Sequence, residues 1–114
     1  MHKAKCHCGD VELSFAELPD TYTICNCSIC RRYGVKWIYF TSSEVSIKEK
    51  TPTTEYIWGD KMIGFHHCSV CGCVTHYIGL PDCGLDRVAI NANLLEYPQL
   101  LDELVIRKFN GADM

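Results

Sequence analysis

Short stretches in which apolar and polar residues alternate recur along the chain. In Val11–Phe15 the side chains of Val11, Leu13 and Phe15 share one face of an extended backbone, because successive side chains of a strand point to opposite faces. Further stretches rich in β-branched and aromatic residues lie at 35–40, 44–49, 54–58, 62–67, 73–78 and 87–92. Turn-forming residues separate them. The pattern predicts a mainly β fold of seven or eight short strands in antiparallel sheets.

Two segments depart from the strand pattern. Residues Ser28–Tyr33 predict one short helical turn, with Asn26 or Ser28 as its N-terminal cap and Gly34 as its stop. Leucines at 100, 101 and 104 suit a helix, whereas the apolar residues of 105–109 suit a strand. We predict a short turn after Pro98 and then a final strand.

Length and composition narrow the class of protein. A chain of 114 residues with 47% apolar and 22% charged residues fits one compact domain, 1–114. The charge is −3, from 11 basic and 14 acidic residues, and the basic residues are scattered, which argues against nucleic acid as a partner. No stretch approaches the roughly 20 apolar residues of a membrane span. The first ten residues contain no apolar run typical of a signal peptide, so we expect a cytoplasmic protein.

Cysteine is the unusual feature of the composition. The chain has nine, an odd number that excludes complete pairing, and in a reducing compartment they are better explained as metal ligands or catalytic thiols than as disulfides. They form three clusters and one isolated residue: Cys6 and Cys8; Cys25, Cys27 and Cys30; Cys68, Cys71 and Cys73; and Cys83.

The first and third clusters share a feature that pairs them. Glycine follows Cys8 and Cys71 directly, where a positive φ lets backbone N–H groups turn toward a thiolate. Four thiolates, from Cys6, Cys8, Cys68 and Cys71, would close a tetrahedral structural zinc site that clips the first strands to a distant hairpin. Disulfides or unliganded buried thiols are the alternatives for these residues.

The middle cluster offers only three converging thiols. Three protein ligands and an open position are the signature of a catalytic zinc, so we expect Cys25, Cys27 and Cys30 to form the catalytic site. Next to a helix start and to Arg31 and Arg32, these thiols should have lowered pKa values.

Several residues around these clusters allow more than one interpretation. Arg31 and Arg32 would suit an anionic substrate, or form a solvated helix face. Cys73 or Cys83 could instead complete a closed second site, or both could be buried core residues. Among the histidines, His66 is the one whose place near Cys68 suggests a ligand.

The cysteine motifs resemble a known family. The segments CHCG, CNCSICRRYG and FHHCSVCGC, followed by INANLLE and RKFNG, resemble the glutathione-dependent formaldehyde-activating enzyme family, which includes the domain of centromere protein V. The resemblance covers Lys5 to Gly111. It implies a zinc-stapled pair of antiparallel sheets called a β-tent, and two Zn²⁺ ions per chain, on the same four and three cysteines as above.

The resemblance also implies a function. Family members are proposed to join glutathione to formaldehyde as carbon–sulfur lyases, with the second zinc meeting the glutathione thiol. It thus suggests glutathione or another small thiol and a small aldehyde as partners. A carrier of glutathione adducts without turnover, and a zinc-stapled interaction module without chemistry, are the alternatives.

Overall fold

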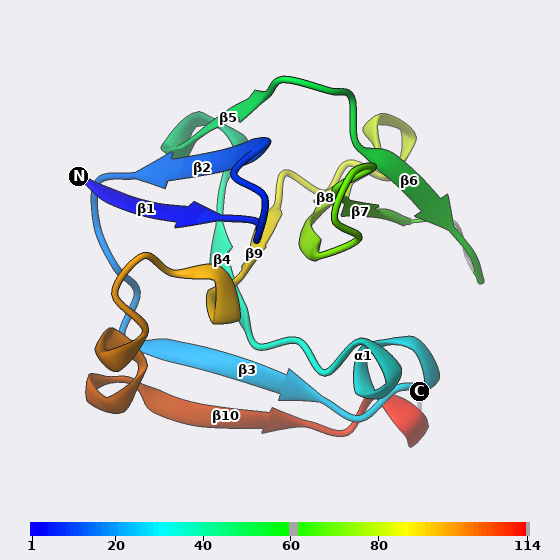
Figure 1. Cartoon of the computed structure of the whole chain (residues 1–114). Coiled ribbons are helices and arrows are strands. Elements are labelled where there is room, and N and C mark those ends of the chain that lie inside the picture. Colours follow the sequence, from blue (N-terminus) through cyan, green and yellow to red (C-terminus); the bar gives the residue numbers. More distant parts are fainter. Residues whose placement is uncertain (60–61, 114) are drawn as a thin grey trace.

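The computed structural model describes residues 1–59 and 62–113, and strands dominate it (Figure 1). The strands are β1 (His2–Lys5), β2 (Val11–Phe15), β3 (Thr21–Cys25), β4 (Trp37–Phe40), β5 (Val45–Glu49), β6 (Thr54–Ile57), β7 (Ile63–His67), β8 (Val74–Gly79), β9 (Val88–Asn91) and β10 (Val105–Phe109). The α-helix in the described residues is α1 (Ser28–Tyr33), and the 3₁₀ turns are η1 (Ser42–Glu44), η2 (Pro81–Cys83), η3 (Ala92–Leu94), η4 (Pro98–Glu103) and η5 (Gly111–Asp113). The prediction of a mainly β fold is confirmed.

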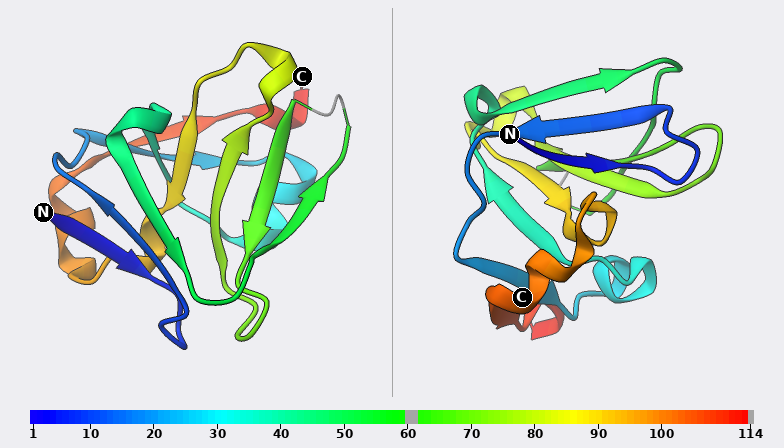
Figure 2. Two further views of the ribbon diagram at one scale, coloured as in Figure 1. Left: turned by 90° about the horizontal axis from the view of Figure 1, so that it is seen from above. Right: turned by 60° about the vertical axis from the view of Figure 1, so that its left-hand side comes forward.

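The strands form two sheets. A three-stranded antiparallel sheet has the order β1-β2-β5, and a seven-stranded sheet has the order β10-β3-β4-β9-β8-β7-β6. The larger sheet is antiparallel except for β10, which pairs in parallel with β3. This parallel pair departs from the predicted antiparallel arrangement. Figure 1 shows β3 and β10 side by side, apart from the β1-β2-β5 sheet, and Figure 2 shows the same arrangement from two other sides.

The alternation of side chains on β4 divides the core in two. Ile38 and Phe40 pack into one apolar cluster with residues of the three-stranded sheet, such as Leu13 and Phe15. On the opposite face of the same strand, Trp37 belongs to a second cluster that contains Cys30, Phe65 and Tyr77. Because side chains alternate along a strand, one face of β4 packs into the first cluster, which is structural. The opposite face, which carries Trp37, belongs to the second cluster and is available for a functional site.

The predicted helical turn is confirmed over Ser28–Tyr33, but its cap is different. Cys27, not Asn26 or Ser28, is the N-cap, and its thiol accepts a hydrogen bond from the backbone N–H of Cys30. Gly34, with φ 67°, ends the helix and donates its N–H to the Cys30 carbonyl, as predicted for the stop. The cap position therefore places a thiol at the start of the helix.

The C-terminal segment follows the prediction of a turn and then a strand. The 3₁₀ turn Pro98–Glu103 leads into β10. Two strands, β1 and β3, were absent from the sequence prediction.

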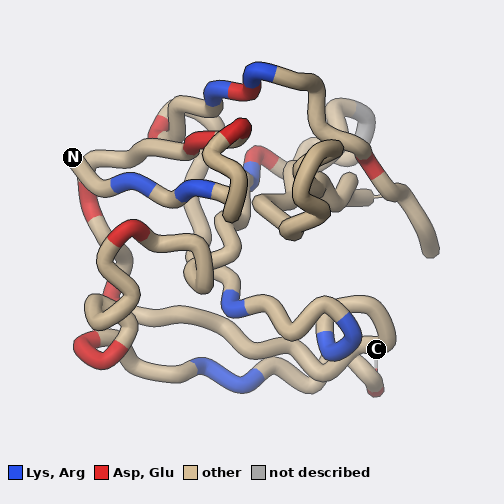
Figure 3. The backbone as a smooth tube through the Cα atoms, in the orientation of Figure 1, with Lys and Arg blue, Asp and Glu red and all other residues tan. Residues whose placement is uncertain are grey.

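Figure 3 shows basic and acidic segments interspersed along the backbone, including a basic segment on α1 and another on β10. No helix in the described part of the chain is long and apolar enough to span a membrane.

Candidate metal centres

Four cysteine sulfurs from two distant parts of the chain meet beside the three-stranded sheet. The Sγ atoms of Cys6, Cys8, Cys68 and Cys71 all lie within 4.8 Å of one another. Cys8 Sγ is 3.6 Å from Cys6 Sγ and 3.6 Å from Cys68 Sγ. A tetrahedral zinc with Zn–S bonds of about 2.3 Å separates its sulfurs by about 3.8 Å. Cys6, Cys8, Cys68 and Cys71 form no disulfide in the structure, so their spacing matches a metal site and not the disulfide alternative.

Two similar backbone turns present these sulfurs. Gly9 and Gly72, which follow Cys8 and Cys71, have φ values of 82° and 81°. Gly9 donates its N–H to the Cys6 carbonyl, and Gly72 donates its N–H to the Cys68 carbonyl. A side chain is strained at such φ values, which explains glycine at both positions.

Backbone N–H groups point at the four sulfurs. Val11 N–H lies 3.3 Å from Cys6 Sγ, and Val70 N–H lies 3.4 Å from Cys68 Sγ. The N–H groups of Cys73 and Cys8 lower the pKa of the Cys71 thiol to about 5. Such donors favour thiolates, the form that binds metal.

Cys8 shows why the group needs a cation. The Asp10 N–H acts to lower the pKa of Cys8, but loss of solvation and the adjacent Cys68 and Cys6 thiols raise it to about 12. Four sulfurs this close cannot all be thiolates unless a positive ion offsets their repulsion. The four-cysteine group can therefore hold a metal ion, and its donor set fits zinc.

The second group contains three thiols at the end of β3 and the start of α1. The Sγ atoms of Cys25, Cys27 and Cys30 lie within 4.8 Å of one another. Cys30 is buried, with 7% of its surface exposed, and the Trp37 indole N–H lies 3.4 Å from its Sγ. Among the side chains described in residues 1–59, 62–81 and 83–113, no fourth His, Cys, Asp or Glu joins this group.

The prediction of lowered pKa values holds for Cys27 alone. Burial opposes ionisation of Cys27, but the N–H groups of Cys30 and Ile29 and the adjacent thiols lower its pKa. Burial raises the pKa of both Cys25 and Cys30, and in Cys30 it outweighs the Trp37 N–H. A metal would favour ionisation of all three thiols.

A cavity of about 670 Å³ opens beside the three-cysteine group. Its lining combines these thiols with residues of five strands, of the segments that follow β6 and precede β9, and of the C-terminal segment: Thr21, Thr23, Cys25, Cys27, Ile29, Cys30, Trp37, Tyr39, Trp58, Gly59, Ile63, Phe65, Tyr77, Arg87, Arg107, Phe109 and Gly111. Tyr77 packs edge-on against Trp37, with ring centroids 4.9 Å apart, and against Phe65, with centroids 5.6 Å apart. The three thiols thus lie at the edge of an aromatic chamber large enough for a small molecule.

Comparison with known proteins identifies the family. The family model of the glutathione-dependent formaldehyde-activating enzyme matches residues 1–103. The chain belongs to this family. The crystal structure of a Rhodobacter sphaeroides protein is similar, with 28% sequence identity, a TM-score of 0.73, and an alignment that covers 92% of this chain and 99% of that one. Among curated proteins, none matches the chain.

The two arginines that follow Cys30 in the sequence do not line the cavity beside the thiols. Arg31 and Arg32 are exposed on α1, and Arg32 donates a hydrogen bond to the Ser28 carbonyl at 2.6 Å. Neither lines the cavity beside the thiols, which is lined instead by Arg87 and Arg107. A role for Arg31 and Arg32 in binding an anionic substrate stays a prediction without support from their position.

The remaining cysteines and histidines are now placed. Cys73 packs at the edge of the four-cysteine group. The His7 N–H acts to lower the pKa of the Cys73 thiol, but burial and the adjacent Cys71 thiol together raise it. Cys83 ends η2 and is not in either metal-binding group. His66 stacks on His76 with ring centroids 4.6 Å apart and is likewise outside both groups. Closure of the second site by Cys73 or Cys83 is therefore not supported.

The C-terminal segment is a part of the site that the sequence did not indicate. Gly111 lies so close that an added Cβ would be 2.7 Å from Cys25 Sγ and 3.0 Å from Cys27 Cβ. Asn26, between these two cysteines, holds the segment: its side chain donates to Asn110 Oδ1 at 2.9 Å and accepts from the Ala112 N–H at 3.0 Å. Only the parallel pairing of β10 with β3 brings these residues together.

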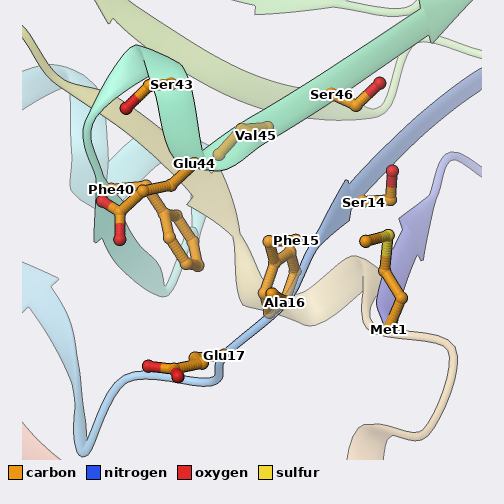
Figure 4. A pocket seen from close by; sticks show the side chains of 10 residues that line it. All are labelled: Met1, Ser14, Phe15, Ala16, Glu17, Phe40, Ser43, Glu44, Val45 and Ser46. Carbon is orange, nitrogen blue, oxygen red and sulfur yellow. The ribbon is translucent and has the colours of Figure 1, made fainter.

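A second hollow, of about 400 Å³, borders the apolar cluster that contains Phe15 and Phe40 (Figure 4). It is lined by Met1, Ser14, Phe15, Ala16, Glu17, Phe40, Ser43, Glu44, Val45 and Ser46. These residues include two carboxylates and three hydroxyls but no thiol or imidazole. This hollow therefore lacks the thiol and imidazole ligands that zinc prefers.

Proposed function

We propose that this protein is a zinc-dependent enzyme of the carbon–sulfur lyase type that joins glutathione to formaldehyde or a related small aldehyde. The observation that carries the proposal is the incomplete ligand set: three cysteine thiols at the edge of an open cavity, with no fourth protein ligand among the described residues. A catalytic zinc keeps such a position for water or substrate. Membership of the glutathione-dependent formaldehyde-activating enzyme family supports the same reaction.

The two cysteine groups would have different tasks. Cys6, Cys8, Cys68 and Cys71 would hold a structural zinc, and Cys25, Cys27 and Cys30 would hold a second zinc. When bound there, zinc supplies a Lewis acid that keeps an incoming thiol ionised near neutral pH.

The covalent step is an addition without redox chemistry. The glutathione sulfur attacks the carbonyl carbon and forms a C–S bond, while the electron pair of the C=O π bond moves to oxygen. That oxygen takes a proton that balances the one lost by the thiol when it ionises, so the product is S-(hydroxymethyl)glutathione when formaldehyde is the aldehyde. No oxidant or reductant is needed.

The chain's own residues would position the reactants. The Trp37 N–H holds Cys30 Sγ in place, and the Cys30 N–H holds Cys27 Sγ. The packed rings of Trp37, Phe65 and Tyr77 line the cavity and would exclude water from that side of it. Orientation of two bound reactants in one chamber is then the main contribution of the protein to rate.

The test is the rate at which glutathione and formaldehyde form the adduct, measured by NMR exchange above the uncatalysed rate. Protein loaded with two zinc ions should accelerate adduct formation, and Cys27→Ser should abolish the acceleration. Cys83→Ser, outside both groups, is the matched control and should retain activity. Tight glutathione binding without acceleration would indicate a carrier, and absence of both would indicate an interaction module.

A further inference from the structure

Two arginines that the sequence does not place near the thiols line the cavity beside them. Arg107 belongs to β10 and Arg87 directly precedes β9. Both side chains are exposed, so a ligand in the cavity can reach them from solvent. Their guanidinium groups are permanently charged and present a fork of donors that matches a carboxylate.

The register of β3 and β10 fixes Arg107 on the same face as the thiols. Arg107 lies opposite Thr23, and Phe109 lies opposite Cys25. Because side chains alternate along a strand, these four residues point to one side, and all four line the cavity. An Arg107 Nη atom lies 3.5 Å from the Thr23 hydroxyl, which confirms this orientation.

Arg87 is held at the part of the cavity farther from the thiols. Its guanidinium lies over the Tyr39 ring, 4.6 Å from the centroid. Thr23 of β3 lies opposite Trp37 of the antiparallel β4. Because β3 and β4 are antiparallel, Tyr39 lies further from Cys25 than Trp37 does. The two residues between them correspond to about 7 Å along the strand.

Neither arginine has a carboxylate partner in the described residues. Among the side chains described in residues 1–59, 62–81 and 83–113, ion pairs join Lys3 to Glu12 and His66 to Glu55, and none involves Arg87 or Arg107. Arg87 also forms a side-chain hydrogen bond with Tyr77, and Arg107 donates one to Thr23, but a guanidinium has five N–H donors, so each arginine keeps others for a ligand. The cavity therefore offers two cations, neither paired with a carboxylate among those side chains, at different distances from the thiols.

We propose that Arg87 and Arg107 bind carboxylate groups of the thiol substrate and thereby select thiols whose carboxylates lie several bonds from the sulfur. The inference rests on the proposed function and names the substrate class of the same site. A thiol with its carboxylate on the neighbouring carbon cannot extend from the cysteines to Arg87, whereas a γ-glutamyl tripeptide such as glutathione can. Three cysteine thiolates and the thiolate of the substrate together carry more negative charge than a divalent cation neutralises. The positive charges of the two arginines offset part of the remainder.

The test compares glutathione with its diethyl ester, which has the same thiol but no carboxylate. Calorimetry on the two-metal protein measures binding directly, without dependence on turnover. We expect wild type to prefer glutathione to the ester by about tenfold or more, since each charge-assisted hydrogen bond contributes about that factor. Arg87→Gln and Arg107→Gln should each lower this preference by up to about tenfold, by weakening glutathione alone.

The matched control is Arg31→Gln, which removes an exposed arginine close to the thiols in sequence but outside the cavity lining. It should leave both affinities unchanged. Equal affinity of wild type for the two thiols, or an equal loss of preference in Arg31→Gln, would overturn the assignment while the proposed function stands. If neither thiol binds to wild type, the proposed function itself fails, and this inference fails with it.

Discussion

The two cysteine groups have the same donor atoms but lie in different surroundings. The four-cysteine group joins residues about 60 positions apart in the chain, and Cys6 and Cys68 are 4% and 0% exposed in the structural core. The three-cysteine group lies within six consecutive residues at the edge of an open cavity. A metal that bridges distant segments restrains much more chain than one that closes a single short loop. The position of ligands along the chain thus separates a stabilising site from a reactive one.

The backbone around each group reinforces this difference. Backbone N–H groups around the two glycine turns point at sulfurs of the four-cysteine group, so the protein offsets part of their charge before a metal binds. The three-cysteine group receives its donors from backbone N–H groups at the start of α1 and from the Trp37 indole. Its sulfurs also border an open cavity, so an incoming ligand can contribute to their charge balance.

The largest expected effect comes from Cys71→Ser. A structural zinc contributes about 10 kcal/mol or more to folding, whereas the net stability of a domain is about 5–15 kcal/mol. We expect the variant to be unfolded at room temperature, as measured by circular dichroism, and to bind less zinc. Cys83→Ser is the control and should melt like wild type. A Cys71→Ser protein with the native melting temperature would show that the group does not staple the fold.

Cys27→Ser should separate activity from stability. Serine is itself a good helix cap, so α1 keeps its start while the thiolate ligand is lost. We expect a loss of about 2 kcal/mol or less, because the ligands close only a short loop. Thermal melting and metal content should reveal a folded protein with one zinc. Global unfolding of this variant would mean that both groups are structural.

The sequence was sufficient to predict the local features of both sites. The four-cysteine group was found from its spacing and from the glycines after Cys8 and Cys71, since both are properties of a few consecutive residues. The same holds for the extent of α1 and its stop at Gly34. Features determined by local backbone chemistry are accessible without a structure.

Features that depend on strand pairing were not predicted. Strand β3 was missed because Thr23 is buried toward a cavity, so its polar side chain hides the usual apolar alternation. The parallel register of β10 on β3 brings Arg107 and Gly111 to the thiols, and no local pattern indicates a pairing across about 80 residues. Because Arg31 and Arg32 follow Cys30 directly in the sequence, they were predicted to bind the anionic substrate. In the structure they lie on the exposed face of α1, outside the cavity lining.

Trp37→Phe should affect one metal without affecting the other. Phenylalanine keeps an aromatic ring against Tyr77 but removes the N–H that lies 3.4 Å from Cys30 Sγ. Loss of such a donor to a metal ligand lowers metal affinity by about 10- to 100-fold. Competition with a chelator should therefore release the second zinc earlier while the first stays bound. Equal weakening of both sites would indicate a general loss of packing.

The smallest effect is expected from Gly111→Ala. The new Cβ would be 2.7 Å from Cys25 Sγ, closer than real contacts allow, so either the C-terminal segment or the sulfur must move. With metal bound, Cys25 is fixed, and the segment held by Asn26 is the part that yields. We expect a several-fold loss of glutathione affinity with a melting temperature close to wild type.

Ala112→Gly is the matched control for that change, since it adds no atom to the same segment. If the C-terminal segment is part of the cavity wall, only Gly111→Ala weakens glutathione binding. A loss of the second zinc in Gly111→Ala would show instead that Cys25 moves more easily than the segment. The metal site would then be less rigid than its contacts with Trp37 and α1 suggest, and the contrast with the four-cysteine group would be stronger.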